Sequence, residues 1–383
     1  MRGRRLRLRR VRVSRRSFAL TVAAVSAGLT RRARADDPVD GEEAHPIDPP
    51  PALEFRTMTW SKSSFFYDGN TTAIAAIPRD LAPGLRLPLV VLMPGGHHNM
   101  QRHDTGCWGW WSEYRLGEID GALRRGTLSN QDFRALARPS DLELFNAYLA
   151  NTPYRGAVLV TPWVVGRQLD PAPHGAMVGA FLRDLVARAR EELPVHQDRA
   201  STGLGGMSSG GLWALHAGAS CSDLFGSVVA TQPFTEELVK PLRAAVTARA
   251  HPQRLRMVTS VDDHQRKSTV ELSEALHADG IAHDLVEYLG AHSAAFAAGP
   301  GGLDALLTFD RSLRGEELDG TRPLPSRDGL SAAVAVDDGE RRIAGPSGTA
   351  GKSDRDALSP TWPLAAIGAV TAGAAIAMRR RPR

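Results

Sequence analysis

The middle of the chain alternates between short apolar runs and longer segments in which apolar residues recur at helical spacing. The run at residues 89–93 (LVVLM) is uninterrupted and ends at Pro94-Gly95-Gly96, a pattern typical of a strand buried on both faces. Further strands are predicted at residues 53–60, 64–77, 157–162, 224–231, 254–261 and 283–289. Helices are predicted at residues 177–192, 271–278 and 294–313. Strands that alternate with helices predict an α/β fold with a mostly parallel central sheet and helices on both faces.

One further stretch has the order strand, tight turn, helix, with a serine at the turn. Ser208 is the central residue of Gly206-Met207-Ser208-Ser209-Gly210, and an apolar, alanine-rich helical segment follows. A serine hydroxyl becomes an effective nucleophile when it is exposed next to a base at the N-terminal end of a helix. The flanking glycines permit a strained turn. The pattern alone is weak, because a chain with 37 glycines in 383 residues contains it by chance about 0.2 times.

Polar residues at the ends of two later strands are candidate partners for this serine. Residues 254–261 run into Asp262-Asp263-His264, and the last predicted strand is followed by His292. Taken singly, these residues would be a solvated acidic turn and a structural loop histidine. Together with Ser208 they follow the chain order Ser, Asp, His that is expected for a sheet of this type. The chain order alone does not decide whether Asp262 or Asp263 is the acidic member of this set.

Three segments carry a resemblance to a known family: residues 206–210, residues 89–97 and Gly290-Ala-His-Ser-Ala-Ala-Phe296. On these segments the chain resembles an α/β-hydrolase over about residues 53–314. It is most similar to the esterase D-type group, which includes secreted feruloyl and acetyl esterases and mycolyl-type acyltransferases. The resemblance implies the α/β-hydrolase fold and an enzyme that works through an acyl-enzyme.

The resemblance also implies roles for individual residues. His292 would deprotonate Ser208, and Asp263 would orient and stabilise the imidazolium. Asp263 is preferred to Asp262 because the acid of the family usually lies three residues beyond a small turn residue, here Ser260. The oxyanion of the tetrahedral intermediate would be held by the backbone N–H of Ser209 and by the loop that contains Gly96 and His97.

The insert at residues 103–151 is long for a strand-to-helix connection and contains three tryptophans. Insertions at this position usually build the substrate pocket, so Trp108, Trp110 and Trp111 are candidate substrate-binding residues. The alternative is that they pack the insert onto the sheet. His97 and His98 suggest a metal pair, but adjacent residues do not easily face one ion, so neither a metal nor another cofactor is expected.

The charge distribution excludes nucleic acid as a partner. The formal net charge is +5, but residues 1–35 contain twelve arginines and no acid, and residues 379–383 contain four more arginines. Between these ends, 31 basic residues face 42 acidic ones, so the middle of the chain is acidic. The two cysteines, Cys107 and Cys221, exclude a disulfide-rich framework and leave open whether they form one disulfide or stay free.

Both ends of the sequence predict export and membrane attachment. Residues 1–35 resemble a twin-arginine export signal, with Arg15-Arg16 before an apolar run; a general secretory signal is the alternative. Residues 361–383 predict a transmembrane anchor with a basic tail, for which a surface helix or a processed sorting tail are alternatives. A disordered linker (36–52) and a flexible spacer (315–360) are predicted to flank the folded domain (53–314).

Together these features predict a serine esterase that is exported and anchored at the outer face of the cytoplasmic membrane or in the cell envelope. Its expected partners are a small-molecule or cell-envelope ester, the export machinery and, through the C-terminal helix, the membrane. Two alternatives remain open at this stage. One is an acyltransferase of the cell envelope on the same fold, and the other is an inactive hydrolase fold that serves as a binding module.

Overall fold

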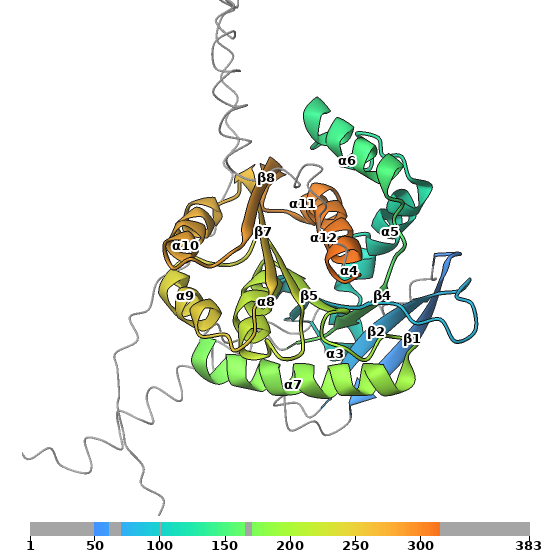
Figure 1. Cartoon of the computed structure of the whole chain (residues 1–383), viewed down its shortest axis with the longest axis horizontal. Coiled ribbons are helices and arrows are strands. Elements are labelled where there is room, and N and C mark those ends of the chain that lie inside the picture. The colour runs from blue at the N-terminus through green and yellow to red at the C-terminus, as the bar shows by residue number, and fades with distance from the viewer. Residues whose placement is uncertain (1–49, 61–69, 100, 165–170, 315–383) are drawn as a thin grey trace, which may run out of the picture. The chain divides into compact units, whose positions relative to one another are not determined.

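The predicted strands form one eight-stranded sheet in the computed structural model, which describes residues 50–60, 70–99, 101–164 and 171–314 (Figure 1). The strands are β1 (Leu53–Trp60), β2 (Thr71–Pro78), β3 (Leu89–Met93), β4 (Val158–Pro162), β5 (Thr202–Met207), β6 (Ser227–Thr231), β7 (Arg254–Asp262) and β8 (Asp284–Ala291). Their order across the sheet is β1-β2-β4-β3-β5-β6-β7-β8. The pairs β1/β2 and β2/β4 are antiparallel, and every other pair is parallel.

The helices are α2 (Gly96–Asn99), α3 (His103–Gly106), α4 (Gly109–Ser112), α5 (Leu116–Arg125), α6 (Pro139–Asn151), α7 (Pro171–Glu192), α8 (Ser209–Ser220), α9 (Val239–Thr247), α10 (Arg266–Ala278), α11 (Ala294–Ala297) and α12 (Pro300–Ser312). Figure 1 shows α7, α8 and α9 on one face of the sheet and α5 and α12 on the other. The predicted α/β architecture with a mostly parallel sheet and helices on both faces is therefore confirmed.

Strand β5 lies at the centre of the sheet and shows how the two helical layers are arranged. Side chains alternate between the faces of a strand. A Cβ added at Gly203 would lie 2.6 Å from the ring of Phe309 in α12. On the opposite face, a Cβ added at Gly218 of α8 would lie 3.3 Å from the side chain of Leu204. The absence of side chains at these glycines lets both helices pack close against β5.

One predicted helix differs from the structure for a local reason. The single helix predicted at residues 294–313 is divided into α11 and α12 at Gly299, where the backbone leaves the helical region (φ −126°, ψ −119°). Pro300 explains the division, because proline disfavours the helical conformation in the residue before it and is well suited to the first position of a helix. The insert at 103–151 is largely helical, since it contains α3, α4, α5 and α6.

The parallel strands bring their carboxyl ends to one edge of the sheet. The residues that follow β3, β5, β7 and β8 include the predicted oxyanion loop, Ser208, Asp263 and His292. The topology therefore places all of these segments at the same edge.

The predicted export signal (1–35), spacer (315–360) and anchor (361–383) lie outside the described residues, as does the predicted linker except for residues 50–52. No helix within the described part of the chain combines the length and the apolar character needed to cross a bilayer.

Candidate active site

Ser208 occupies a strained turn between β5 and α8. Its backbone has φ 56° and ψ −117°, a conformation that is costly for a residue with a side chain. The turn is held by the Ser208 N–H, which donates to Thr231 O at 3.0 Å, and by the Ser208 carbonyl, which accepts from the N–H groups of Leu212 and Phe234, each at 3.0 Å. Backbone hydrogen bonds to β6, α8 and the loop after β6 thus fix this conformation.

The glycines around Ser208 are required because the backbone segments approach each other closely. A Cβ at Gly206 would lie 2.2 Å from the Gly210 carbonyl oxygen, and one at Gly210 would lie 2.3 Å from the Met93 carbonyl oxygen. Neither position has room for a side chain. These contacts give the Gly-x-Ser-x-Gly pattern a structural reason, because the turn between β5 and α8 is too tight for larger residues.

Ser208, His292 and Asp263 form a hydrogen-bonded chain. Nε2 of His292 lies 2.9 Å from Oγ of Ser208, and Nδ1 of His292 lies 2.9 Å from Oδ1 of Asp263. The serine is thus next to a candidate base, and the base is oriented by a carboxylate. Sequence reasoning proposed these three residues, and the structure brings all three together.

Asp263, and not Asp262, contacts the histidine. Asp263 is 5 % exposed, and besides its contact with His292 its carboxylate accepts hydrogen bonds from the Gln265 N–H at 2.9 Å and the Thr259 hydroxyl at 3.0 Å. Burial alone would raise the pKa of Asp263, but the hydrogen bonds from His292, Gln265 and Thr259 hold this pKa below its ordinary value. Asp262 ends β7 and is exposed. The arrangement keeps the buried carboxylate ionised beside the imidazole.

Gln232 is a buried residue of the site that the sequence reasoning missed. Its side-chain N–H₂ donates to Oγ of Ser260 at 2.6 Å and to the carbonyl oxygen of Ala291 at 3.0 Å. It therefore links the end of β7 to the end of β8, directly before His292. The sequence could have pointed to Gln232, because it is a polar residue that directly follows the buried strand β6. In a parallel sheet, functional side chains gather at the carboxyl ends of the strands.

The predicted oxyanion loop lies against the start of α8. A Cβ at Gly96 would come within 3.3 Å of Oγ of Ser209, and the side chain of Asn99 donates to the same oxygen at 3.3 Å. Gly96 and Ser209 are thus neighbours, as an oxyanion hole requires. The side chain of His97 is exposed, and its ring contacts the ring of His98.

The three candidate substrate-binding tryptophans lie in the insert but differ in exposure. Trp110 (1 % exposed) donates its indole N–H to Met93 O, and Trp111 (5 % exposed) donates to the hydroxyl of Thr161. These two residues pack the insert onto the sheet, which was the alternative considered for them from the sequence. Trp108 is only partly buried and contacts the ring of Phe55 edge to face at 5.4 Å.

Both cysteines are buried free thiols, which settles the question that the sequence left open. Sγ of Cys107 lies near Asp104 O in α3, whereas Sγ of Cys221 lies near Gly179 O in α7. Burial raises the pKa of Cys107 to about 12, so its thiol stays protonated and unreactive at neutral pH.

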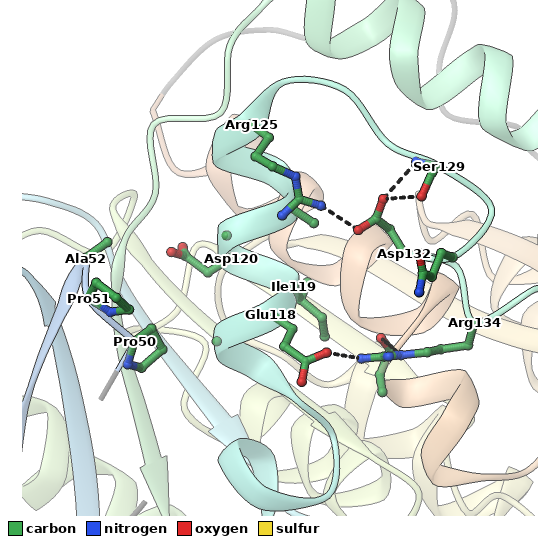
Figure 2. Close-up of a pocket in the computed structure, with 15 residues that line it drawn as sticks. Pro50, Pro51, Ala52, Glu118, Ile119, Asp120, Arg125, Ser129, Asp132 and Arg134 are labelled. Carbon is green, nitrogen blue, oxygen red and sulfur yellow. Dashed lines mark hydrogen bonds and ion pairs between the residues drawn. The ribbon is translucent and has the colours of Figure 1, made fainter. Parts of the chain in front are cut away.

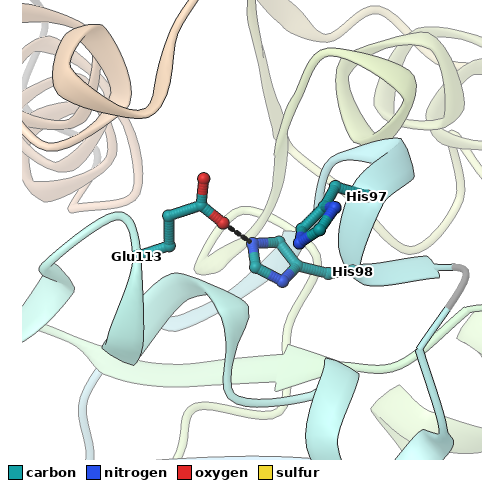
Figure 3. Close-up of side chains that lie close together, drawn as sticks. All are labelled: His97, His98 and Glu113. Carbon is teal, nitrogen blue, oxygen red and sulfur yellow. Dashed lines mark ion pairs between the residues drawn. The ribbon is translucent and has the colours of Figure 1, made fainter. Parts of the chain in front are cut away.

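Two groups of side chains in the described part of the chain have the composition and spacing to hold a metal ion. The first consists of Asp263, His264 and His292, and two of its members are already joined in the hydrogen-bonded chain with Ser208. The second consists of His97, His98 and Glu113 (Figure 3). The structure places one ligand atom of each adjacent histidine within 4.8 Å of the other and of Glu113, although their adjacency was the reason for expecting no metal.

A cavity of about 520 Å³ lies away from the catalytic candidates, between Pro50–Ala52 and α5 (Figure 2). Four of its charged side chains are paired with one another: Arg125 with Asp132 at 2.6 Å, and Arg134 with Glu118 at 2.6 Å. The fifth, Asp120, pairs with Arg124 at 2.6 Å. None of Ser208, Asp263 and His292 lines it.

A second cavity, of about 470 Å³, is lined by α9, α10 and His264, whose ring lies 4.5 Å from that of His292. This cavity is therefore the one of the two that adjoins the hydrogen-bonded chain. Besides His264, its lining residues are mostly charged: Glu236, Glu237, Val239, Lys240, Lys267, Ser268 and Glu271.

The sequence matches no family model and no curated protein sequence. Among solved structures, a ferulic acid esterase is 14% identical, with 68% of this chain and 98% of that chain aligned and a TM-score of 0.50. An S-formylglutathione hydrolase from Staphylococcus aureus is 10% identical over 67% of this chain and 99% of its own, with a TM-score of 0.47. A ferulic acid esterase from Anaeromyces mucronatus is 16% identical over 68% and 91%, with a TM-score of 0.47. The chain therefore has the α/β-hydrolase fold, with an eight-stranded, mostly parallel sheet.

Proposed function

We propose that this protein is a serine hydrolase that cleaves a carboxylic ester through an acyl-enzyme. The observation that carries the proposal is the chain Ser208–His292–Asp263, with both hydrogen bonds at 2.9 Å, at the carboxyl edge of the sheet. A strained serine turn, an adjacent imidazole and a buried carboxylate together form the arrangement that acyl transfer to serine needs.

In this mechanism His292 takes the proton from Oγ of Ser208 as that oxygen attacks the ester carbonyl carbon. Asp263 holds the imidazole in the tautomer that presents Nε2 to the serine, and it stabilises the imidazolium that forms. His292 then donates the proton to the departing alcohol oxygen, which leaves an acyl group on Ser208. A water molecule, deprotonated by His292, attacks the acyl carbonyl and releases the carboxylic acid and the free serine.

The negative charge on the carbonyl oxygen requires hydrogen-bond donors, each of which contributes about 3 kcal/mol to transition-state stabilisation. The proposed donors are the backbone N–H of Ser209, at the start of α8, and the backbone N–H groups of the Gly96–His97 loop. The close packing of Gly96 and Asn99 against Ser209 supports this assignment.

The test combines a fluorophosphonate probe with p-nitrophenyl esters on the purified chain. We expect the wild type to be labelled on Ser208 and to hydrolyse the esters, and Ser208→Ala and His292→Ala to lose both properties. Ser220→Ala is the matched control, because Ser220 is exposed at the far end of the same helix and should label as the wild type does. Labelling that persists in Ser208→Ala, or a wild type that never labels, would overturn the proposal.

The same assay separates hydrolysis from acyl transfer. If water is the acceptor, added alcohols leave the rate of acid release unchanged. If the added alcohol is the acceptor, less free carboxylic acid is released and a new ester of that alcohol appears. This result would identify the enzyme as an acyltransferase.

We also propose that the domain works outside the cytoplasmic membrane. The support is the arginine-rich, apolar segment at residues 1–35 and the apolar segment with a basic end at residues 361–383. Protease added to intact cells should then degrade the domain, and Arg15→Lys with Arg16→Lys should keep it inside. A domain that stays protected on intact wild-type cells would contradict export.

A further inference from the structure

A group of three potential metal ligands lies outside the proposed triad, next to the oxyanion loop. His97 and His98 belong to α2, and Glu113 follows the last residue of α4. One ligand atom from each side chain lies within 4.8 Å of the other two. Figure 3 shows the three side chains converging from their two helices, with Glu113 and His98 in contact.

The buried member of this group has no ordinary hydrogen-bonding arrangement. His98 is 3 % exposed, and within the described ranges neither of its ring nitrogens makes a hydrogen bond. Its Nε2 forms an ion pair with Oε2 of Glu113 at 2.7 Å (Figure 3), whereas Nδ1 faces no such partner. Buried polar atoms without partners are rare and cost free energy. A bound cation would satisfy the ring nitrogen and use the nearby carboxylate.

The ring of His98 is held in place by the backbone around it. A Cβ at Gly109 would lie 2.4 Å from ring atoms of His98, so glycine at this position makes room for the imidazole. The rings of His97 and Tyr114 pack edge to face on that of His98, at 5.2 and 5.3 Å. One ligand is therefore fixed, whereas the side chains of His97 and Glu113 are exposed and, among the described residues, held only by single polar contacts to Gln101, at 3.3 Å, and to His98.

Two imidazoles and one carboxylate match the preferences of zinc. Zn²⁺ binds such ligands at about 2.0–2.2 Å in a tetrahedron, which sets the ligand atoms about 3.4 Å apart. The ligand atoms of the group lie within 4.8 Å of one another, so the exposed side chains of His97 and Glu113 would have to move closer to bind the ion. Ca²⁺ and Mg²⁺ prefer sites made of oxygen atoms. Three protein ligands leave a fourth position for water.

We propose that His97, His98 and Glu113 form a zinc site that ties α2 to the end of α4. Helix α2 carries Gly96 and Asn99, which lie against Ser209 at the start of the nucleophile helix. The ion would therefore hold α2, which contains Gly96 and Asn99, in a fixed position against Ser209. The proposal does not depend on ester hydrolysis, because metal binding is measured without a substrate.

The test is isothermal titration of the full-length chain with ZnCl₂, after treatment with a chelator and without a polyhistidine tag. We expect one zinc ion to bind with a dissociation constant that rises on the order of 100-fold or more in His97→Ala and in Glu113→Gln. Both replaced side chains are exposed, so the variants should fold, and circular dichroism checks this.

Two control variants identify the group that binds the ion. Glu118→Gln removes an exposed glutamate outside the group, and His264→Ala removes a member of the other potential metal group. Zinc affinity should be unchanged in both. No binding by the wild type, unchanged affinity in both His97→Ala and Glu113→Gln, or loss of binding only in His264→Ala would each overturn the proposal.

Discussion

The side chains of the proposed triad are held in place by three different means. Ser208 is presented by a strained backbone turn, and Asp263 is fixed by hydrogen bonds from its surroundings. His292 directly follows Ala291, whose carbonyl is held by Gln232. Catalysis requires reacting groups to be placed to within fractions of an ångström. The supporting hydrogen bonds provide this placement before a substrate arrives.

Replacing the acid tests which aspartate matters. We expect Asp263→Asn to lower the rate of ester hydrolysis on the order of 10⁴-fold, because an amide favours the wrong imidazole tautomer and does not stabilise the imidazolium. Asp262→Asn should change the rate by less than about tenfold, since Asp262 is exposed. Steady-state kinetics on a p-nitrophenyl ester measures both effects. The opposite ranking would transfer the role to Asp262.

Asp263 should also contribute to stability in a pH-dependent way. Its pKa in the folded protein lies below the ordinary value of 3.8, so the unfolded chain binds a proton first as the pH falls. The stabilising contribution is thus complete above about pH 5 and is lost as the pH falls through the folded pKa. Urea unfolding at a series of pH values should show a shallower acid loss of stability in Asp263→Asn. An equally steep loss in both proteins would contradict this assignment.

At the scale of elements, the site depends on how closely α8 approaches β3 and β5. Gly206 and Gly210 let the end of β5 and the first turn of α8 pass within contact distance of each other and of Met93. The first backbone N–H groups of α8 are not used within the helix. Close packing places this end of α8 beside Gly96 and so makes the proposed oxyanion hole.

Adding one methyl group at this contact should therefore be destabilising. Gly210→Ala would place a Cβ 2.3 Å from Met93 O, and we expect the free energy of unfolding to fall by about 2–3 kcal/mol. Gly121→Ala in α5 is the matched control, because no atom lies within 4 Å of its added Cβ. That change should raise stability by about 0.5–1 kcal/mol. Equal effects in urea unfolding would argue against the close contact.

At the scale of the whole molecule, a buried ion pair joins the sheet to α12. The guanidinium of Arg256 in β7 makes two hydrogen bonds, at 2.7 and 2.6 Å, to the carboxylate of Asp304 in α12. The hydroxyl of Tyr288 in β8 donates to the same carboxylate at 2.6 Å. Burial alone would lower the pKa of Arg256, but Asp304 raises it, so the guanidinium stays charged. The network fixes α12 against the strands that carry Asp263 and His292.

Removing the carboxylate should destabilise the whole domain. We expect Asp304→Ala to lower the free energy of unfolding by about 3–5 kcal/mol, because it removes the buried partner of Arg256 and leaves that charge only the half-exposed Asp284, at 3.6 Å. Asp223→Ala breaks an exposed pair with Arg183 and should cost less than about 1 kcal/mol. Chemical denaturation of both variants makes the comparison. A cost for Asp304→Ala as small as for Asp223→Ala would show that the network contributes little.

Much of the fold could be predicted from local pattern. The run at residues 89–93 corresponds to β3 residue for residue, because a strand buried on both faces has no polar positions to blur its limits. Boundaries were less accurate where polar residues enter an element, so α10 begins at Arg266 rather than at residue 271. The glycine pattern and the chain order of Ser208 and His292 pointed to the segments that the topology brings together.

The sequence by itself therefore determined the alternation of strands and helices, the serine turn and the segments that meet at the sheet edge, since these follow from backbone periodicity and local sterics. Only the tertiary structure decided which side chains face one another. An irregularity between Ser260 and Asp262 in the pairing of β7 with β8 precedes the buried Asp263 and leaves Asp262 exposed. The approach of Glu113 to His98 across 15 residues likewise depends on how α2 and α4 pack. The local sequence pattern is the same for two adjacent residues such as Asp262 and Asp263, so it does not tell which of them contacts the histidine. Tertiary packing decides this contact.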